Sequence, residues 1–313
     1  MAAVKHDELI TRLRDGNMAA LARAISLADS GSEDGRRLHR EVGRHSGDAR
    51  VLGITGAPGA GKSSLINALI TALRRADRRV AVVAVDPSSL ISGGAVLGDR
   101  TRMGIHSADS GVFIRSVSGR GHLGGLSRST ESIIDLLAAA GWPLIILETI
   151  GTGQSETEIV NVADVNIVIN APGLGDDIQA VKAGVLEIAD ILVVNKADLP
   201  LAKQTVRDLQ VMLQHRRIGA LDVPVLETVA TEETGISELL ATVDAKLATI
   251  TGEVRRERLR NHIRKTLARQ VGETVEQRLM ARPDPEIETL CEDVLNGECD
   301  SEDAVRQLMG LVL

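Results

Sequence analysis

The chain has 313 residues, of which 43% are hydrophobic and 25% are charged, a balance typical of a globular protein. Its formal net charge of −7, from 36 basic and 43 acidic side chains, argues against a protein that binds nucleic acid by neutralising phosphates. Aromatic residues make up only 1%, so the platforms on which nucleic-acid bases stack are missing too.

The cysteine content and the distribution of apolar residues bear on the compartment. Cys291 and Cys299 are the only cysteines, which is too few for a disulfide framework and favours a reducing compartment. The first eight residues lack the apolar core of a signal peptide. No apolar run approaches the roughly 18 residues of a membrane span. We therefore expect a soluble, cytoplasmic protein.

The first 48 residues are predicted to form a helical extension. Apolar residues fall near helical spacing over residues 5–29, with a weak point at Asp15-Gly16-Asn17. Ser32 is placed to cap a second helix over about residues 33–45. Because these helices precede the first strand, we expect them to pack outside a nucleotide domain.

Residues 49–250 alternate between predicted strands and predicted helices. Strands are expected at 51–55, 80–85, 111–114, 144–148, 165–170, 191–195 and 224–228. Helices are expected near 63–75, 126–140, 176–188, 203–217 and 235–249. Several strands are continuous apolar runs, as in parallel strands buried on both faces. The alternation predicts an α/β doubly wound, mostly parallel sheet with ligands at the C-terminal ends of its strands.

Residues 251–313 differ in character and are predicted to form a C-terminal helical arm. A basic helix follows Thr251, the run Arg282-Pro283-Asp284-Pro285 breaks it, and an acidic helix and a last helix near 301–312 come after. One interpretation is an arm that docks on a second subunit, giving a homodimer. The other is two solvated helical faces, which charge alone favours.

Residues 56–63 match the phosphate-loop pattern GxxxxGK[ST], and they lie between a predicted strand and a predicted helix, as this pattern requires. The glycines allow successive N–H groups to point inward at the N-terminus of a helix, where phosphate is favoured. Lys62 is expected to reach the β- and γ-phosphates, and the Ser63 hydroxyl is expected to bind Mg²⁺. The nucleotide-binding candidates here are Gly56, Ala57, Pro58, Gly59, Ala60, Gly61, Lys62, Ser63 and Ser64.

The run Asn195-Lys196-Ala197-Asp198 follows a predicted apolar strand and indicates guanine recognition. A buried Asp198 carboxylate would accept hydrogen bonds from guanine N1–H and N2–H₂ and would reject adenine, which lacks that donor pair. Asn195 is expected to tie this segment to the phosphate loop, and the stem of Lys196 to cover the base. Ala230 is a candidate donor to guanine O6, or simply the end of a strand.

A third group of candidates follows the strand predicted at 144–148. Glu148, at its C-terminal end, is placed to hold Mg²⁺ directly or through water. Gly151 can donate its N–H to the γ-phosphate. Gln154 either orients the attacking water or only holds its loop.

Two further aspartates are candidates for Mg²⁺. Asp86 closes a predicted strand and Asp99 lies in a segment bounded by glycines; the alternative for either is a helix cap. Farther along, residues 171–184 carry glycines at both ends and charged groups between them. This pattern favours a movable signalling loop, the alternative being a plain strand-to-helix connection. The predicted catalytic groups are Lys62, Asp99, Glu148 and Gln154, and the predicted metal ligands are Ser63, Asp86, Asp99 and Glu148.

Several long motifs occur in one order along the chain: LARAISLAD, GAPGAGKSS, VDPSS, LGDRTRM, RGHLGGLSRST, ETIGTGQSE and APGLGDDIQAVKAGVLEIADILVVNKADL. Together they resemble the MeaB/ArgK/MMAA group of GTPase chaperones that serve adenosylcobalamin-dependent acyl-CoA mutases. The resemblance covers about residues 9–280. It implies a P-loop GTPase domain related to the metallochaperone GTPases, with helical extensions at both ends and a C-terminal dimerisation arm. It also implies that the 171–184 loop signals the nucleotide state to the mutase.

The sequence thus predicts an enzyme that hydrolyses GTP to GDP and phosphate with Mg²⁺. Its expected role is to gate the loading, protection or reactivation of a cobalamin-dependent acyl-CoA mutase of the methylmalonyl-CoA mutase type. One alternative is a nickel- or metal-insertion GTPase of the same superfamily, and another is a P-loop kinase linked to amino-acid transport. The expected partners are the mutase and a second copy of the chain, with no nucleic acid and no membrane.

Overall fold

The structure is a computed structural model that describes residues 2–30, 32–42, 49–86, 104–106, 108–118, 128–149, 159, 162–173, 188–214, 223–281 and 285–312. Contacts within the chain divide it into two compact units, Met1–Arg255 and Arg256–Leu313.

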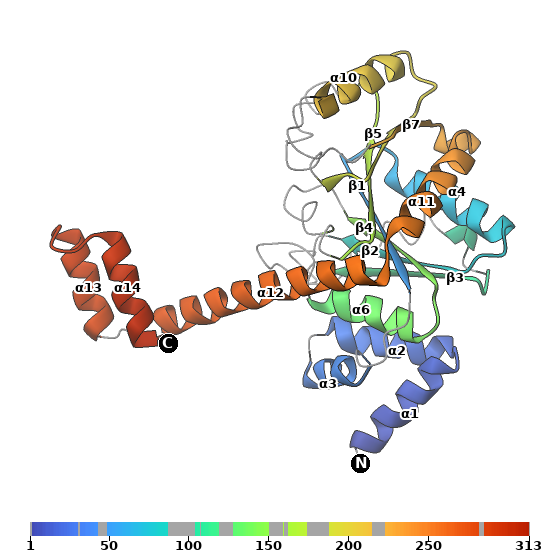
Figure 1. Cartoon of the computed structure of the whole chain (residues 1–313). Coiled ribbons are helices and arrows are strands. Elements are labelled where there is room, and N and C mark those ends of the chain that lie inside the picture. The colour runs from blue at the N-terminus through green and yellow to red at the C-terminus, as the bar shows by residue number, and fades with distance from the viewer. Residues whose placement is uncertain are drawn as a thin grey trace. The chain divides into compact units, whose positions relative to one another are not determined.

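The first unit is built on one seven-stranded sheet (Figure 1). Its strands are β1 (Arg50–Gly56), β2 (Val80–Asp86), β3 (Val112–Ser118), β4 (Leu144–Thr149), β5 (Val165–Asn170), β6 (Ile191–Asn195) and β7 (Val225–Thr228). They lie in the order β3-β2-β4-β1-β5-β6-β7, and every neighbouring pair is parallel. The predicted α/β doubly wound sheet is confirmed.

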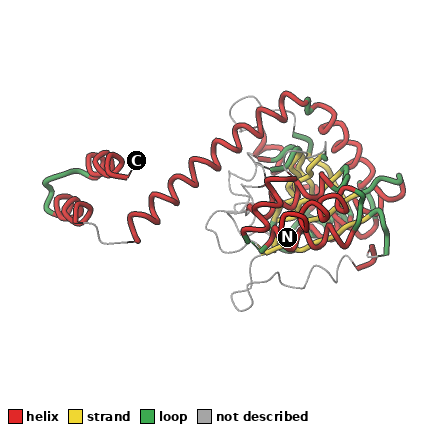
Figure 2. The backbone as a smooth tube through the Cα atoms, turned by 90° about the horizontal axis from the view of Figure 1, so that it is seen from below, coloured by secondary structure: helices red, strands yellow, loops and turns green. Residues whose placement is uncertain are grey.

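Helices cover both faces of this sheet, which explains its continuous apolar strands (Figure 2). On one face, Leu52 and Ile54 of β1 pack in a core with α4 (Lys62–Arg75) and α11 (Ile236–Thr249). On the other face, Val51 packs in a core with α6 (Arg128–Ala139). Toward the far edge, α10 (Ala202–Gln214) covers β6 and β7.

The N-terminal helices are α1 (Ala2–Arg14), α2 (Met18–Asp29) and α3 (Glu33–Val42). The predicted weak point is a full break, because Gly16 takes a left-handed φ of 77° and Asn17 caps α2 by accepting a 2.9 Å bond from the Ala20 N–H. The predicted cap at Ser32 is also present, since its hydroxyl accepts from the N–H of Gly35. In Figure 1, α2 and α3 lie beside α6, outside the sheet.

The short segment around residues 250–255 is fastened to the start of β1. Arg255 donates a hydrogen bond to the carbonyl of Ala49, and its Nε lies 3.5 Å from Asp164 Oδ1. The other carboxylate oxygen of Asp164 accepts a 2.8 Å bond from the Val51 N–H. The first turn of the helix that begins at Gly252 is therefore held against the start of β1, the strand that leads to the phosphate loop.

The C-terminal helices are α12 (Gly252–Ala281), α13 (Pro285–Leu295) and α14 (Ser301–Val312). Within the second unit, α13 packs against α14 and buries Leu290 and Ala304. Three apolar residues of α12, Ile263, Leu267 and Val271, are spaced four residues apart and about half exposed.

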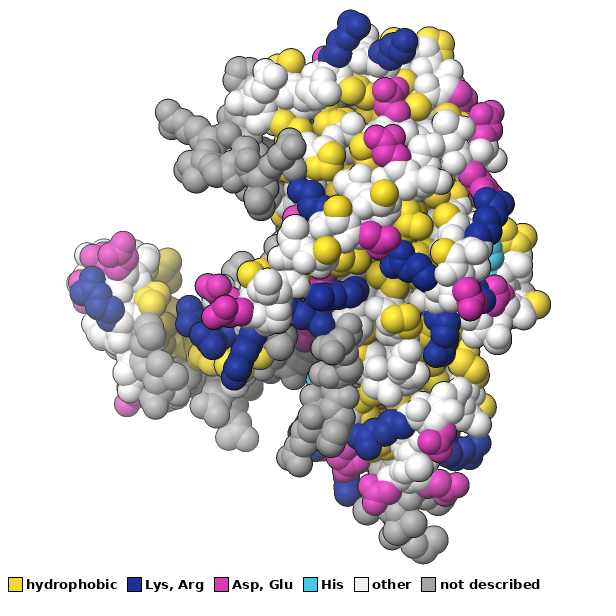
Figure 3. All heavy atoms as spheres, turned by 45° about the vertical axis from the view of Figure 1, so that its right-hand side comes forward, with side chains coloured by type: hydrophobic (Ala, Val, Ile, Leu, Met, Phe, Trp, Pro, Cys, Tyr) yellow, Lys and Arg dark blue, Asp and Glu magenta, His cyan; other side chains and the backbone are white. Residues whose placement is uncertain are grey.

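Basic and acidic side chains are interspersed over the face shown in Figure 3. Among the helices that the structure describes, none has the length and apolar content that crossing a bilayer requires.

Candidate functional site

The phosphate loop joins β1 to α4 and adopts a conformation that needs glycine at defined points. Gly56, Gly59 and Gly61 have φ angles of 149°, 81° and 90°, a region that other residues rarely occupy. A Cβ atom on Gly61 would lie 2.4 Å from Asn195 Nδ2, and one on Gly56 would lie 2.2 Å from the Ile169 carbonyl oxygen. At Gly61 the constraint is therefore both conformational and steric.

Lys62 begins α4 and is 8% exposed. Its ammonium donates to the carbonyl oxygens of Gly56 and Ala57, at 2.7 and 3.1 Å. The cation thus sits within the turn of the phosphate loop, which keeps its charge at the place where a phosphate chain would add negative charge.

Ser63 and Glu148 meet across the sheet end. The Ser63 hydroxyl donates a 3.1 Å hydrogen bond to Glu148 Oε1, and the Glu148 side chain is buried at the end of β4. A hydroxyl and a carboxylate side by side next to a phosphate loop are the oxygen ligands that Mg²⁺ prefers. These two residues therefore fit a magnesium ion.

Asn195 is the centre of a buried network between the phosphate loop and β7. Its Nδ2 donates a 2.9 Å bond to the Ala60 carbonyl, which is the tie to the phosphate loop that we expected. Its Oδ1 accepts from the Thr228 hydroxyl and from the Ala230 N–H, both at 3.1 Å. The N–H of Ala230, expected as a donor to guanine O6, is thus engaged by Asn195.

The residues next to Asn195 reach solvent. Lys196 is exposed and takes a left-handed φ of 58°, which turns the chain sharply after β6. Asp198 is exposed as well, so our expectation of a buried carboxylate was wrong. The reason is that it follows a turn at the C-terminal edge of the sheet, where no described element covers it. An exposed carboxylate at this edge remains accessible to an incoming base.

Several predicted residues cannot be placed beside this cluster. Asp99, Gly151 and Gln154 lie outside the described residues, as does most of the 171–184 loop. Asp86 ends β2, the strand next to β4, but its side chain is outside the description. The structure brings together the phosphate loop, Ser63, Glu148 and Asn195, with Asp198 just beyond.

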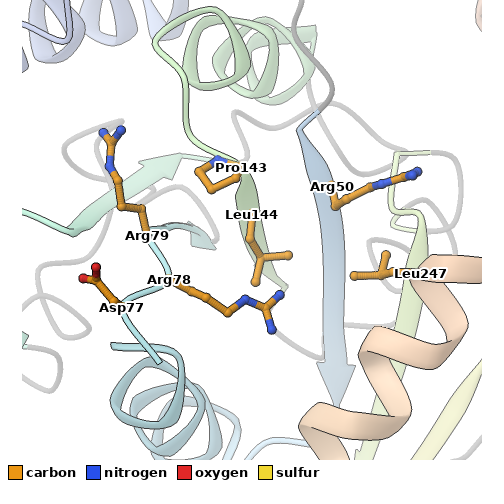
Figure 4. A pocket seen from close by; sticks show the side chains of 7 residues that line it. All are labelled: Arg50, Asp77, Arg78, Arg79, Pro143, Leu144 and Leu247. Atoms are coloured by element: carbon orange, nitrogen blue, oxygen red, sulfur yellow. The ribbon is translucent and has the colours of Figure 1, made fainter. Parts of the chain in front are cut away.

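A pocket of about 330 Å³ lies at the opposite, N-terminal edge of the sheet (Figure 4). It is lined by Arg50, Asp77, Arg78, Arg79, Pro143, Leu144 and Leu247. Arg78 is held there by a bidentate pair with Asp244, and the guanidinium of Arg79 lies 4.4 Å from the ring centre of Trp142. Because Arg50 begins the strand that ends in the phosphate loop, this pocket is not the nucleotide site.

Three buried polar atoms near the phosphate loop were not singled out by the sequence. The hydroxyls of Thr55 and Thr149 and the Nδ2 of Asn170 have no hydrogen-bond partner in the part of the chain that the structure describes. Each such group costs about 1–3 kcal/mol of stability. Thr149 belongs to the motif ETIGTGQSE, but none of the three was assigned a role from the sequence, because each is an ordinary residue near the end of a strand.

The fold and this site define the class of the protein. An all-parallel α/β sheet, a phosphate loop between its central strand and a helix, and an Asn-Lys-x-Asp segment after β6 are the features of a P-loop GTPase, which binds GTP and GDP. The family model described as "Methylmalonyl Co-A mutase-associated GTPase MeaB" matches residues 21–284. The chain therefore belongs to the MeaB family of P-loop GTPases.

Individual relatives agree with that assignment. The chain is 42% identical over 308 residues to a protein of Pyrococcus horikoshii that carries the name GTPase, covering 94% of each chain. It is 37% identical over 289 residues to GTPase ArgK of Escherichia coli, covering 88% of this chain and 87% of that one. The crystal structure of an LAO/AO transport system kinase superposes with a TM-score of 0.77 and 28% identity, over 99% of this chain and 98% of that chain.

Proposed function

We propose that this GTPase is a chaperone of a cobalamin-dependent acyl-CoA mutase of the methylmalonyl-CoA mutase type. The observation that carries the proposal is the match of residues 21–284 to a family described as associated with methylmalonyl-CoA mutase. A nematode relative, 39% identical over 207 residues, bears the name "Methylmalonic aciduria type A homolog, mitochondrial", and it supports the same proposal. In this role, the GTP and GDP states would differ in their affinity for the mutase and so gate loading, protection or reactivation of its cofactor.

We assign hydrolysis to the cluster at the C-terminal edge of the sheet. Water attacks the γ-phosphate, while Lys62 and backbone N–H groups of the phosphate loop neutralise the developing charge. Ser63 and Glu148 would hold Mg²⁺, which when bound supplies further positive charge to the phosphates. Asp86, Asp99 and Gln154 stay proposed contributors, as do Gly151 for the γ-phosphate and Asp198 for guanine.

The 171–184 loop is our proposed signalling element. It begins directly after β5, the strand beside the phosphate-loop strand, so its first residues lie at the nucleotide edge. Asp177 and Lys182 belong to this loop and lie outside the described residues. They are not expected to touch the reacting phosphate, so they should carry coupling to the mutase and not catalysis.

GTP turnover with and without a cognate mutase tests both proposals. Asp177→Ala and Lys182→Ala should leave basal hydrolysis within a few-fold of wild type but should largely remove its acceleration by the mutase. That loss corresponds to a coupling free energy of about 1–3 kcal/mol. Failure of the wild-type protein to respond to any acyl-CoA mutase in turnover or cofactor transfer would refute the chaperone role. A parallel fall of basal and stimulated rates would instead place the loop in the active site.

The kinase alternative has one observation in its favour, the structural neighbour that is named as a kinase of an LAO/AO transport system. A kinase transfers the γ-phosphoryl group to an acceptor, whereas a GTPase releases it to water as inorganic phosphate. Incubation with γ-labelled GTP separates the two. Label that appears only as free phosphate supports the hydrolase.

We also propose that the chain forms a homodimer through residues 251–313. The exposed apolar residues Ile263, Leu267 and Val271 recur every fourth position on α12, so they form one stripe along that helix. A stripe of this kind fits against a second apolar helix face, and the same stripe on a second copy meets that requirement.

A further inference from the structure

Thr149 and Asn170 are the last residues of β4 and β5, and Thr55 is the next-to-last residue of β1, the strand between them. The register that pairs Ile54 with Glu148 places Thr55 directly beside Thr149. Thr55 itself pairs with Val168, so Asn170 lies two residues farther along the neighbouring strand. We call these three residues the polar row.

The polar row lies on the face of the sheet that carries α6. Side chains alternate between the two faces of a strand. Leu147 packs in the core on the α6 face, so Thr149, two residues later, lies on the α6 face as well. Ile146 packs in the core on the α4 face, so Glu148 lies on the α4 face. The end of β4 therefore places the Glu148 carboxylate beside Ser63 on one face, and the Thr149 side chain on the opposite face, which Thr55 shares.

The polar row is buried, and three of its polar atoms lack a hydrogen-bond partner in the described part of the chain. Thr55 and Thr149 are 0% exposed and Asn170 is 8% exposed. The two hydroxyls and the Asn170 Nδ2 have no hydrogen-bond partner among the described residues. Asn195 at the same edge differs, because its amide makes three hydrogen bonds. Valine matches threonine in shape and suits a strand, so a requirement for stability alone does not account for the two hydroxyls.

The position of the polar row along the edge of the sheet indicates which part of the nucleotide site it lies beside. The proposed guanine-recognition segment begins at the end of β6, the phosphate loop begins at the end of β1, and Glu148 is the next-to-last residue of β4. The polar row spans β4, β1 and β5, which is the phosphate and metal end of the site and not the base end. Their side chains are short and lie at the ends of these strands, so a water molecule is the group that can connect them to a phosphate.

We propose that the polar row positions the water that attacks the γ-phosphate of GTP. An attacking water needs acceptors for its protons, so that a lone pair faces phosphorus. The hydroxyls of Thr55 and Thr149 can accept such bonds, and the amide of Asn170 supplies a donor that fixes them in orientation. These are positioning residues, since they act on the reaction through ordered water. The proposal rests on the GTPase activity alone and does not require a mutase partner.

Thr55→Val and Thr149→Val in the full-length protein test this proposal. Each change removes a buried, unpaired hydroxyl and keeps the shape, so the melting temperature of the protein without nucleotide should stay the same or rise. The Kd for GDP and the KM for GTP should stay within about twofold of wild type. The kcat for GTP hydrolysis should fall about ten- to hundredfold, because the water loses its orientation. Thr55→Ser and Thr149→Ser keep the hydroxyl and should restore most of that rate.

A matched control is available in α6. The hydroxyl of Thr130 is also fully buried without a partner among the described residues, but it lies in a helix and not at the end of a strand. Thr130→Val should change the melting temperature in the same direction and leave kcat unchanged. The proposal is overturned if the strand valine variants keep the wild-type kcat. It is equally overturned if they lose thermal stability and GDP binding together with kcat, or if the serine variants fail to recover the rate.

Discussion

Asn195 Nδ2 donates a 2.9 Å hydrogen bond to the carbonyl oxygen of Ala60, a residue 135 positions earlier in the chain. The same side chain accepts two hydrogen bonds on its other side, from Thr228 and Ala230. One buried amide thereby holds the phosphate loop against the segment that follows β7, and the relative position of the two depends on it.

Replacing Asn195 with alanine should weaken both folding and nucleotide binding. The change removes three hydrogen bonds and leaves the Ala60 carbonyl and the Thr228 hydroxyl without this partner in a buried place. We expect a loss of roughly 2–4 kcal/mol in unfolding free energy, measured by urea denaturation. GTP and GDP should lose affinity together, because the loop binds the phosphates that both share. Thr205→Val is the control, since that buried hydroxyl donates locally to the carbonyl of Leu201, the residue just before α10. Normal nucleotide affinity in Asn195→Ala would contradict the assigned role.

Local patterns predicted the sheet well for a physical reason. Strands buried on both faces must be apolar throughout, and the phosphate loop needs glycines at fixed positions, so both leave a mark in the sequence. Turn-forming and helix-breaking residues also identify the two predicted weak points, at Asp15-Gly16-Asn17 and at Arg282–Pro285. The structure has helix boundaries at Arg14 and Met18 and at Ala281 and Pro285, as these patterns indicated.

Contacts between distant residues could not be predicted in this way. His39 meets Asp135 across 96 positions, and Val51 meets Asp164 across 113. Each of these is an ordinary helix, strand or loop residue within its own stretch of sequence. Only the packing of α3 on α6, or of β1 beside the segment before β5, makes them partners. The polar row was missed for the same reason, because its members come together only through the strand order.

Asp198→Asn should change the nucleotide specificity of the protein from guanine to xanthine. A carboxylate only accepts hydrogen bonds, as the N1–H and N2–H₂ of guanine require, whereas an amide can also donate to the second carbonyl of xanthine. The exposed position of Asp198 leaves its carboxylate accessible to the base. Competition binding should show GTP affinity lost and affinity for xanthosine triphosphate gained. If wild-type protein bound ATP as well as GTP, Asp198 would not be the selecting group.

The contact between α3 and α6 should depend on pH. The 2.8 Å hydrogen bond between His39 Nε2 and Asp135 Oδ2 raises the pKa of His39 above its usual 6.5. Partial burial lowers this pKa, but the negative charges of Asp135 and Glu131 raise it further, so the net shift is upward. A raised pKa in the folded state stabilises the fold fully below about pH 6.5, and this stabilisation is lost as the pH rises through the folded pKa.

We therefore expect His39→Gln to lower stability at pH 5.5 more than at pH 8.5. The difference should stay under about 1 kcal/mol, because both side chains are about one-third exposed and solvent screens the pair. Urea denaturation across this range measures it. Asp135→Asn should flatten the same pH dependence, and the double variant should add little. Equal losses at both pH values would mean that the protonated pair contributes nothing.

The C-terminal arm should be removable by truncation, but the stability of the remaining chain should depend on the residue at which it ends. Arg255 is the last residue of the first unit, and its guanidinium bonds the Ala49 carbonyl and pairs with the buried Asp164 carboxylate. A chain that ends after Arg255 keeps these contacts, whereas a chain that ends after Thr251 loses them. Both should fold and bind GTP, and both should be monomers if residues 251–313 carry the proposed dimer interface.

The shorter chain should be less stable by about 1–2 kcal/mol, the value of a hydrogen-bonded charged group at a partly buried site. The full-length variant Arg255→Ala should show the same loss while it remains a dimer, which separates anchoring from assembly. Urea denaturation measures the first and light scattering at micromolar concentration measures the second. A full-length protein that scatters as a monomer would rule out the dimer. Equal stability of the two truncated chains would show that Arg255 does not fasten the root of α12 to β1.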